Sequence, residues 1–384
     1  MSPSTASDRP VGLSTDWRVG FLGDLHGDLD HLLRVAQTMW AHGISTLIVL
    51  GDFGFIWPHG NWDNTIDKIS RRLGKLGQIL YFVDGNHEDF TRLYRFPLDA
   101  DGVRRIRPNI IHLPRGYRTT LVSGREVAVL GGANSIDRDQ RVEGRSWWAG
   151  EAITDADLTV LGSETAPLLI GHDAPLHVPA LERELAATDR DWSAEALAYA
   201  AAGRAVFHRG FLTVQPELYL GGHYHLHIDE QVTYHSEGGE FTCRVVILDM
   251  NGTATATSQA ILGVDTFALT SRTRDADTVH ELRGDEAGVW EVSTEHSTHI
   301  LDFDRGVSER RAGPDSMPFP GDNSRQLRTI ERCRVGEIGF WTFISHNRLM
   351  EFYWHQSTEI KNIRRLKRED PEDERTPKPS AEPI

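Results

Sequence analysis

The chain has 384 residues, which is longer than one average domain and enough to bury a sizeable hydrophobic core. Its 41 Lys and Arg residues and 56 Asp and Glu residues give a formal net charge of −15, which disfavours non-specific binding to the phosphate backbone of nucleic acids. The two cysteines, Cys243 and Cys333, lie far apart and have no third partner, so neither a disulfide framework nor a thiolate zinc site is indicated. We therefore expect a protein of the reducing cytoplasm.

The two ends of the chain have compositions that do not favour a packed core. Residues 1–16 are rich in Ser, Thr and Pro and lack the apolar core of a secretory signal, so we expect a disordered lead-in. Residues 367–384 are dense in Pro and charged residues, which is typical of a disordered tail. No stretch is long and apolar enough to span a bilayer, and we expect no membrane association.

Apolar runs and amphipathic patterns alternate over the first part of the chain. Residues 19–22, 44–50 and 79–83 are typical of short buried strands. Asp28 is placed to cap a first helix, whose apolar face carries Leu29, Leu32, Leu33, Ala36 and Trp40. A second helix is predicted from Ile66, Ile69 and Leu73. This βαβαβ order indicates an α/β domain with both sheet faces covered, and such sheets bind ligands beyond the carboxyl ends of their strands.

Strands dominate the next part of the chain, up to a boundary that we place near Thr270. Residues 117–122 and 127–130 flank an S-G-R turn like a hairpin, and residues 252–260 show no clear periodicity. Further strands are predicted at 168–170, 218–220, 230–234 and 244–248. We therefore expect two packed sheets with helices outside over residues 17–270.

Residues 278–366 have a different character. Short apolar segments separated by Gly, Pro and Asp turns predict a small, β-rich accessory domain. It carries no clustered His and carboxylate pairs, so we expect a role in packing, oligomerisation or recognition. The sequence shows no internal repeat and predicts no oligomeric state.

Side chains that can bind metals recur where the predicted strands end in glycine. They are Asp24, His26, Asp52, Asn86, His87, His172, His223 and His225. Each taken alone has an ordinary structural explanation, such as a helix cap for Asp24 or a turn for Asn86. Five separate turns are harder to explain by coincidence, because oxygen and imidazole donors gathered at one end of a sheet suit a two-metal hydrolytic site.

The ordered motifs D-x-H, G-D, G-N-H-E, G-H and G-H-x-H, across residues 17–250, resemble those of the calcineurin-like metallophosphoesterase superfamily. The longer contexts G-A-N-S-I-D-R, S-W-W and G-H-D-A-P look like those of bacterial members, especially an actinobacterial-type subgroup. The resemblance implies a four-layer α-β-β-α sandwich with mixed sheets and a centre of two divalent metal ions at one edge.

Carried over by position, the resemblance implies two ligand sets that share Asp52 as a bridge. One metal would be held by Asp24, His26, Asp52 and His225, and the other by Asp52, Asn86, His172 and His223. Mixed nitrogen and oxygen ligands accept manganese, iron, zinc or nickel, and we expect Mn²⁺ first.

The resemblance also implies a di-metal-dependent phosphoesterase that hydrolyses a phosphomonoester or phosphodiester by in-line attack of a metal-bridging hydroxide. His87 would be the catalytic residue, stabilising the pentacovalent state or protonating the leaving oxygen. The expected substrate is a phosphorylated small molecule or a nucleotide. Nucleotide phosphodiesterase and protein phosphatase-like activities stay open, as does a metal-bound, non-catalytic binding or scaffold protein.

Two departures from the superfamily pattern bear on the site. No acidic residue follows Asp52 closely, so the residue that orients His87 is unassigned. The chain has G-D-F-G-F-I-W where phosphoprotein phosphatases carry G-D-x-V-D-R-G, and the missing arginine weakens a protein phosphatase assignment. Substrate phosphate contacts are expected instead from a loop that carries Arg138, Arg141 and Arg145. Trp147 could stack on a nucleobase, and the alternative for it is core packing. The alternative for each arginine is exposure at the surface.

Overall fold

The computed structural model describes residues 13, 15–58, 60–188, 192–236, 238–253, 255–270, 279–313, 324–345 and 350–366. The expected tail at 367–384 lies outside the described residues, and so does most of the expected lead-in at 1–16. The chain divides into two compact units. Unit 1 comprises residues 1–273 together with 283–286, and unit 2 comprises residues 274–282 and 287–384.

The first sheet of unit 1 has seven strands. In order across the sheet they are β13 (Ala268–Thr270), β12 (Gln259–Gly263), β1 (Arg18–Leu22), β2 (Thr46–Val49), β3 (Ile79–Phe82), β5 (Ile110–His112) and β4 (Arg104–Arg107). The strands β1, β2, β3 and β5 are parallel, and β12 pairs antiparallel with β1. The sequence did not predict β12, because nearly all of its residues are buried and no polar alternation marks it.

The second sheet has six strands and is also parallel at its centre. Their order is β10 (Ile228–Ser236), β11 (Gly239–Ile247), β9 (Leu218–Gly221), β8 (Leu168–Gly171), β7 (Glu126–Leu130) and β6 (Arg118–Thr120). The strands β7, β8, β9 and β11 are parallel, whereas β6 and β10 pair antiparallel with their neighbours. The predicted hairpin around the S-G-R turn is confirmed as the pair of β6 and β7.

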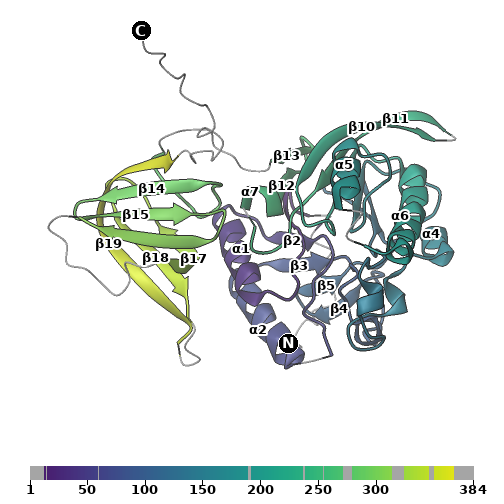
Figure 1. Ribbon diagram of the computed structural model, residues 1–384, viewed down its shortest axis with the longest axis horizontal. Coiled ribbons are helices and arrows are strands. Elements are labelled where there is room, and N and C mark those ends of the chain that lie inside the picture. Colours follow the sequence, from purple (N-terminus) through teal and green to yellow (C-terminus); the bar gives the residue numbers. More distant parts are fainter. Residues whose placement is uncertain are drawn as a thin grey trace, which may run out of the picture. The chain divides into compact units, whose positions relative to one another are not determined.

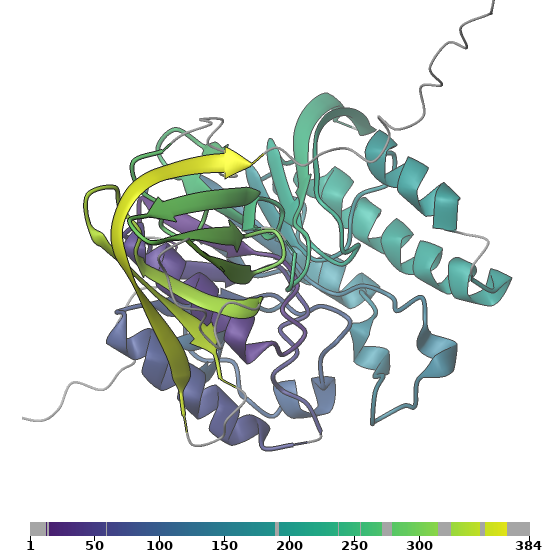
Figure 2. The ribbon, with the colours of Figure 1, turned by 60° about the vertical axis from the view of Figure 1, so that its left-hand side comes forward.

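Helices cover the outer faces of the two sheets (Figures 1 and 2). The first sheet is covered by α1 (Leu29–Ala41) and α2 (Trp62–Lys75), and the second by α4 (Asp155–Leu161), α5 (Pro179–Thr188) and α6 (Ala194–Val214). The connecting loops contain the short helices α3 (Phe90–Leu93), η2 (Arg138–Gln140), η3 (Ala149–Glu151) and α7 (Thr255–Ser258).

Three apolar cores hold these layers together. The core between the sheets contains Phe21 from β1 and Ile170 from β8. The outer cores contain Leu32 of α1 on the first sheet and Phe207 of α6 on the second. Each such side chain contributes about 1.5–3 kcal/mol when it is fully buried. The layers confirm the predicted α/β class and the four-layer α-β-β-α sandwich with mixed sheets.

The first helix shows how the sequence sets local structure. The Asp28 carboxylate caps α1 by accepting a hydrogen bond of 2.9 Å from the backbone N–H of His31, as its position predicts. The buried face of the helix includes Val35 and Met39. The prediction that Trp40 belongs to this face is wrong, since its side chain is 49% exposed at the edge of the apolar stripe.

Unit 2 is a closed antiparallel barrel, drawn in green and yellow in Figure 1. Its strands are β14 (Val289–Thr294), β15 (Ser297–Asp302), β16 (Val307–Ala312), β17 (Arg325–Arg332), β18 (Ile338–Ile344) and β19 (Phe352–Leu366). Its interior is filled by large apolar side chains such as Trp290 and Trp341. This barrel confirms the predicted β-rich C-terminal module.

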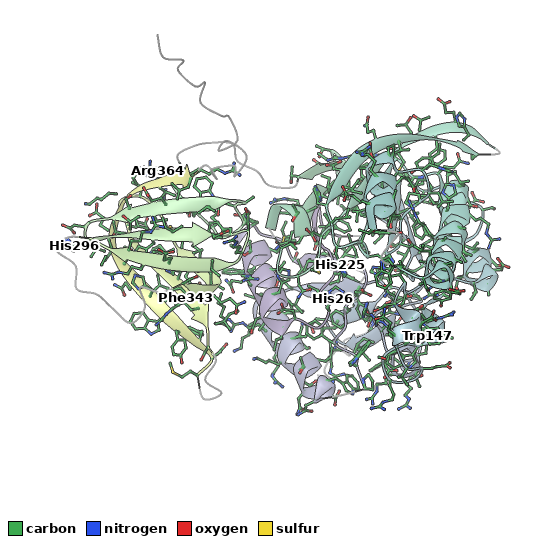
Figure 3. The ribbon with its side chains drawn as sticks, in the orientation of Figure 1. His26, Trp147, His225, His296, Phe343 and Arg364 are labelled. Atoms are coloured by element: carbon green, nitrogen blue, oxygen red, sulfur yellow. The ribbon has the colours of Figure 1, made fainter. Side chains whose placement is uncertain are left out.

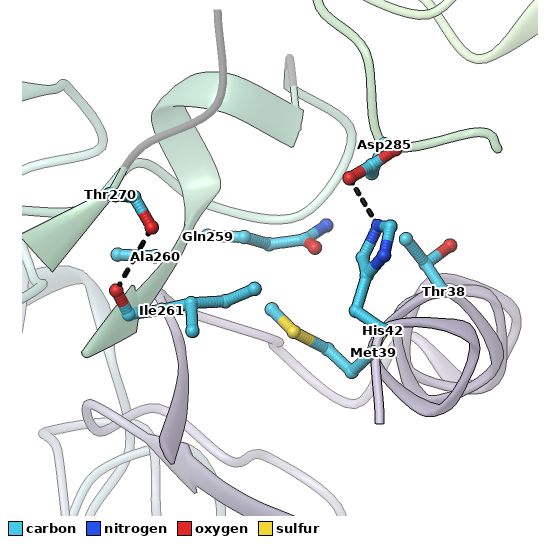
Figure 4. A pocket seen from close by; sticks show the side chains of 8 residues that line it. All are labelled: Thr38, Met39, His42, Gln259, Ala260, Ile261, Thr270 and Asp285. Atoms are coloured by element: carbon cyan, nitrogen blue, oxygen red, sulfur yellow. Dashed lines mark hydrogen bonds and ion pairs between the residues drawn. The ribbon is translucent and has the colours of Figure 1, made fainter. Parts of the chain in front are cut away.

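A short segment of later sequence belongs to unit 1. Residues 283–286 pack there, and Figure 4 shows the carboxylate of Asp285 paired with the imidazole of His42, which follows α1.

Among the described residues, no helix is long and apolar enough to cross a membrane.

Candidate metal centre

The loops that follow five parallel strands bring the predicted metal-binding residues together. Asp24 and His26 follow β1, Asp52 follows β2, and Asn86 follows β3. His172 follows β8 in the second sheet, and β9 leads into His223 and His225. Because parallel strands present their carboxyl ends at one edge, the two packed sheets place all these side chains at a common site.

Four of these residues form a compact group that could hold a metal ion. One ligand atom each from Asp24, His26, Asp52 and His225 lies within 4.8 Å of all the others. His26 Nε2 lies 3.3 Å from Asp52 Oδ2, and His225 Nε2 lies 3.3 Å from Asp24 Oδ2. Figure 3 shows His26 and His225 next to each other, and their ring centroids are 4.8 Å apart. Both carboxylates are buried.

A second group of donors adjoins the first. The amide Oδ1 of Asn86 lies 3.1 Å from His172 Nε2 and 2.9 Å from His223 Nδ1. His172 Nε2 also lies 3.4 Å from Asp52 Oδ1. Asp52 therefore turns one carboxylate oxygen toward each group.

Left-handed backbone conformations are concentrated at this site. His26, Asp52, His223 and His225 have φ angles of 46°, 46°, 73° and 54°. Residues with a Cβ adopt this region at a cost of about 1–3 kcal/mol, and such conformations cluster at functional sites. The backbone of these loops is therefore strained, and in this conformation their side chains point toward the centre.

Hydrogen bonds outside the two groups fix the imidazole rings. His26 Nδ1 lies 3.0 Å from the amide Oδ1 of Asn251, whose Nδ2 donates to Asp28 at 3.1 Å. His172 Nδ1 lies 2.7 Å from the carbonyl oxygen of Leu50. In each ring Nδ1–H can donate outward, which leaves Nε2 directed at the centre. Sequence reasoning missed Asn251.

The electrostatics of the centre favour positive charge between the donors. Burial opposes the charged form of His26, but hydrogen bonding and charge from Asp52 outweigh it and raise the pKa of His26 to about 9. In the same way, Asp52 raises the pKa of His172 to about 10. The charges of His87 and His172 outweigh burial and hold the pKa of Asp52 well below its usual value. A divalent cation provides the same compensation, so this set of oxygen and nitrogen donors fits a metal.

His87 lies beside the centre and contacts an arginine. Its Nε2 is 3.9 Å from Asp52 Oδ2, and its two ring nitrogens each lie 3.1 Å from a terminal nitrogen of Arg141. Arg141 is held by both carboxylate oxygens of Asp137, at 2.6 and 2.7 Å. Burial, with the charge of Arg141 adding to it, lowers the pKa of His87. The structure therefore places an arginine–aspartate pair against the ring whose orienting residue the sequence left unassigned.

A buried hydrogen-bond chain fixes the amide of Asn86. Its Nδ2 donates to the hydroxyl of Ser135 at 3.0 Å, which directs its Oδ1 at the two imidazoles. The Ser135 hydroxyl donates to Glu151 at 2.6 Å, and Glu151 also accepts from the hydroxyl of Tyr199 at 3.0 Å. The sequence motif G-A-N-S-I-D-R contains Ser135 but gave it no role, and Glu151 lacked any local signal.

The acidic residues on either side of the G-N-H segment, Asp84 and Glu88, hold loops. Asp84 accepts from Arg115 Nε at 2.7 Å and lies 3.0 Å from His112 Nε2. Arg115 and His112 outweigh the effect of burial and lower the pKa of Asp84. Glu88 accepts from the backbone N–H of Phe53 at 2.7 Å, which ties the loops after β2 and β3 together.

Of the residues predicted to contact the substrate, Arg141 lines the cavity at the centre, whereas Arg138, Arg145 and Trp147 do not. This cavity includes residues of both donor groups and is also lined by His87. The Arg138 guanidinium lies over the ring of Tyr199, 4.1 Å from its centroid, and Arg145 is exposed. Figure 3 shows Trp147 away from His26 and His225.

Comparison with protein families agrees with this geometry. Residues 18–227 match the family model described as calcineurin-like phosphoesterase. Among solved structures, the chain is similar to TT1561 of Thermus thermophilus, with 15% identity and a TM-score of 0.39 over 66% of this chain and 99% of that one. A second solved structure is similar at 16% identity with a TM-score of 0.40, over 66% of this chain and 97% of its own. No curated protein matches. The chain belongs to the calcineurin-like phosphoesterase family.

Proposed function

We propose that the chain is a metal-dependent phosphoesterase whose site holds two divalent cations. The two oxygens of Asp52 carry this proposal. Oδ2 lies 3.3 Å from His26 Nε2 in one donor group, and Oδ1 lies 3.4 Å from His172 Nε2 in the other. A buried carboxylate with one oxygen toward each group suits a ligand shared between two cations.

Each cation would have mixed nitrogen and oxygen ligands. The first would be held by Asp24, His26, Asp52 and His225, and the second by Asp52, Asn86, His172 and His223. We propose Mn²⁺ as the preferred ion, with iron, zinc and nickel also compatible with this donor set.

The chemistry needs both the cations and residues of the chain itself. When bound, two such cations polarise a phosphoryl oxygen as Lewis acids and lower the pKa of water. His87 stands outside both ligand sets and lines the cavity, where its ring can hydrogen-bond the leaving oxygen. Arg141, fixed by Asp137, lines the same cavity, and a guanidinium binds phosphate oxygens in pairs. The substrate class that follows is a phosphomonoester or phosphodiester.

Hydrolysis of two nitrophenyl esters tests the proposal. Bis(p-nitrophenyl) phosphate and p-nitrophenyl phosphate release the same chromophore, so their kcat/KM values with added Mn²⁺ are directly comparable. We expect turnover by the wild type and a loss of at least about 100-fold in Asp52→Asn. Asp265→Asn changes an exposed aspartate and should leave turnover unchanged. No turnover of either ester by the wild type, or equal turnover by Asp52→Asn, would refute the proposal.

His87→Asn separates catalysis from metal binding. The substitution leaves both proposed ligand sets intact, so Mn²⁺ binding measured by calorimetry should stay at the wild-type level while kcat falls, by about 100-fold or more. The wild type could instead bind two Mn²⁺ and, like the His87→Asn variant, hydrolyse no phosphoester. That result would show a metal-bound binding or scaffold protein.

A further inference from the structure

The candidate metal centre forms only one end of a much larger cavity. This cavity has a volume of about 980 Å³ and is lined only by residues of unit 1. Pockets that bind drug-sized ligands measure about 300–1,000 Å³, so the cavity has room for far more than a phosphate group. The remaining space can therefore hold another part of the ligand.

Two helices build the wall of the cavity away from the metal centre. The lining residues of these helices are Glu182, Leu185, Ala186 and Thr188 from α5, and Leu197, Ala200, Ala201 and Arg204 from α6. Their spacing of three and four residues places each set on one face of its helix. Because Ala200 and Ala201 end in a single methyl group, the face of α6 leaves space in front of it.

On α6 and in the loops beside the two helices, the cavity also has apolar surface that the folded core does not use. Leu176, Trp192, Leu197 and Met250 line the cavity and are only partly buried. None of these four side chains belongs to the three apolar cores of unit 1. Their apolar surface is therefore available to a ligand.

The charged groups on and beside this wall already have hydrogen-bond partners within the protein. The Arg204 guanidinium donates to the Pro175 carbonyl oxygen at 2.7 Å and to the Glu182 carboxylate at 2.9 Å. The Asp173 carboxylate accepts from the Tyr224 hydroxyl at 2.5 Å. Arg204 and Glu182 thus compensate each other's charge and Asp173 has a hydrogen-bond donor, which disfavours a second charged group on the ligand.

We propose that the wall formed by α5 and α6 binds the alcohol part of the substrate, and that this part is uncharged and largely apolar. The inference rests on the proposed function, since the phosphoryl group must lie at the metal centre beside Arg141. The alcohol part then extends along Leu197 and Ala201. A polyhydroxylated alcohol would leave its hydroxyl groups without partners against this surface, which costs affinity.

Alkylphosphonates test the wall without requiring turnover, because a phosphoesterase does not cleave their P–C bond. In calorimetry with the full chain and Mn²⁺, affinity should rise from methyl- through butyl- to octylphosphonate, by about three- to fourfold for each methylene that becomes fully buried. A polyhydroxylated phosphonate of equal chain length should bind more weakly than its alkyl counterpart. Affinity that does not depend on chain length, or that favours the hydroxylated chain, would overturn the inference.

Two adjacent alanines provide a matched pair of variants. Ala201 and Ala202 are both exposed on α6, but only Ala201 lines the cavity. Ala201→Glu should abolish the dependence of affinity on chain length, whereas Ala202→Glu should keep it. An identical dependence in both variants would show that the alkyl chain does not lie on this wall.

Turnover of p-nitrophenyl phosphate in the same preparations separates the two proposals. Turnover together with a flat alkylphosphonate series would refute the apolar wall and leave the phosphoesterase function standing. A rising series with no turnover of any phosphoester would support the wall and contradict the proposed function.

Discussion

Gly85→Ala tests how closely the backbone of the G-N-H-E segment must approach the shared carboxylate. Gly85 does not have a positive φ, so its backbone conformation accepts alanine. An added methyl group would lie 2.8 Å from His172 Nε2 and still closer to two atoms of Asp52, its Oδ1 and its backbone nitrogen. Since ordinary contacts begin at 3.4 Å, His172 must retreat by about 0.6 Å and Asp52 by more.

Displacements of this size matter more for the site than for the fold. Because the methyl group also meets the Asp52 backbone, the loop after β2 must move, and such overpacking costs about 1–3 kcal/mol or more. A typical domain is stable by about 5–15 kcal/mol, so we expect unit 1 to stay folded with reduced stability. A misplacement of about 1 Å costs on the order of 100-fold in rate. We therefore expect kcat/KM for p-nitrophenyl phosphate to fall by about 100-fold and Mn²⁺ affinity to fall with it.

The control for Gly85→Ala is Gly74→Ala in α2. A methyl group at position 74 would meet only Asn109, at 3.8 Å, so activity should be unchanged and stability should rise by up to about 1 kcal/mol. Thermal unfolding establishes that both variants are folded, and calorimetry with Mn²⁺ and ester hydrolysis report on the site. A folded Gly85→Ala variant with wild-type Mn²⁺ affinity and turnover would refute the reasoning.

Three further predictions concern residues outside the two donor groups. Asn251→Ala removes the oxygen 3.0 Å from His26 Nδ1, so Mn²⁺ affinity in calorimetry should fall roughly 10- to 100-fold, and an unchanged affinity would contradict this role. Burial raises the pKa of Glu151 in the folded chain. Between the ordinary and the raised pKa, the folded chain therefore binds more protons than the unfolded chain, so the free energy of unfolding falls as the pH rises through that range. Denaturant unfolding at several pH values should show this decline in the wild type but not in Glu151→Gln. An equal dependence of the unfolding free energy on pH in both proteins would contradict this role of Glu151. Burial also raises the pKa of the Cys243 thiol, so an aromatic disulfide reagent at pH 8 should modify it only after unfolding, and modification in the native protein would argue otherwise.

The parts of the fold that the sequence predicted are those with strong local patterns. Apolar runs that end in glycine marked β1, β2, β3, β8 and β9, because a buried parallel strand needs a continuous apolar run and a tight turn after it. Asp28 marked the start of α1 for the same local reason. The barrel strands were recognised as β-rich, but their closure depends on pairings such as β14 with β19, and no local pattern contains that information.

The same distinction applies to the candidate site. The metal-binding residue types in the turns after the strands can be read directly from the sequence, and the fold brings those turns together. Asn251 lies 225 residues from His26 in sequence, and Arg141 lies 54 residues from His87, so neither contact leaves a local pattern. The wall of α6 was also hidden, because an apolar stripe such as Leu197 and Ala201 has the same spacing whether it faces a core or a cavity.

Anomalous diffraction from a crystal grown with Mn²⁺ would test the central claim most directly. We predict two manganese peaks that share Asp52 as a ligand. One should lie against Asp24 and His225, and the other against Asn86 and His223. A single peak, or peaks that do not contact Asp52, would contradict it.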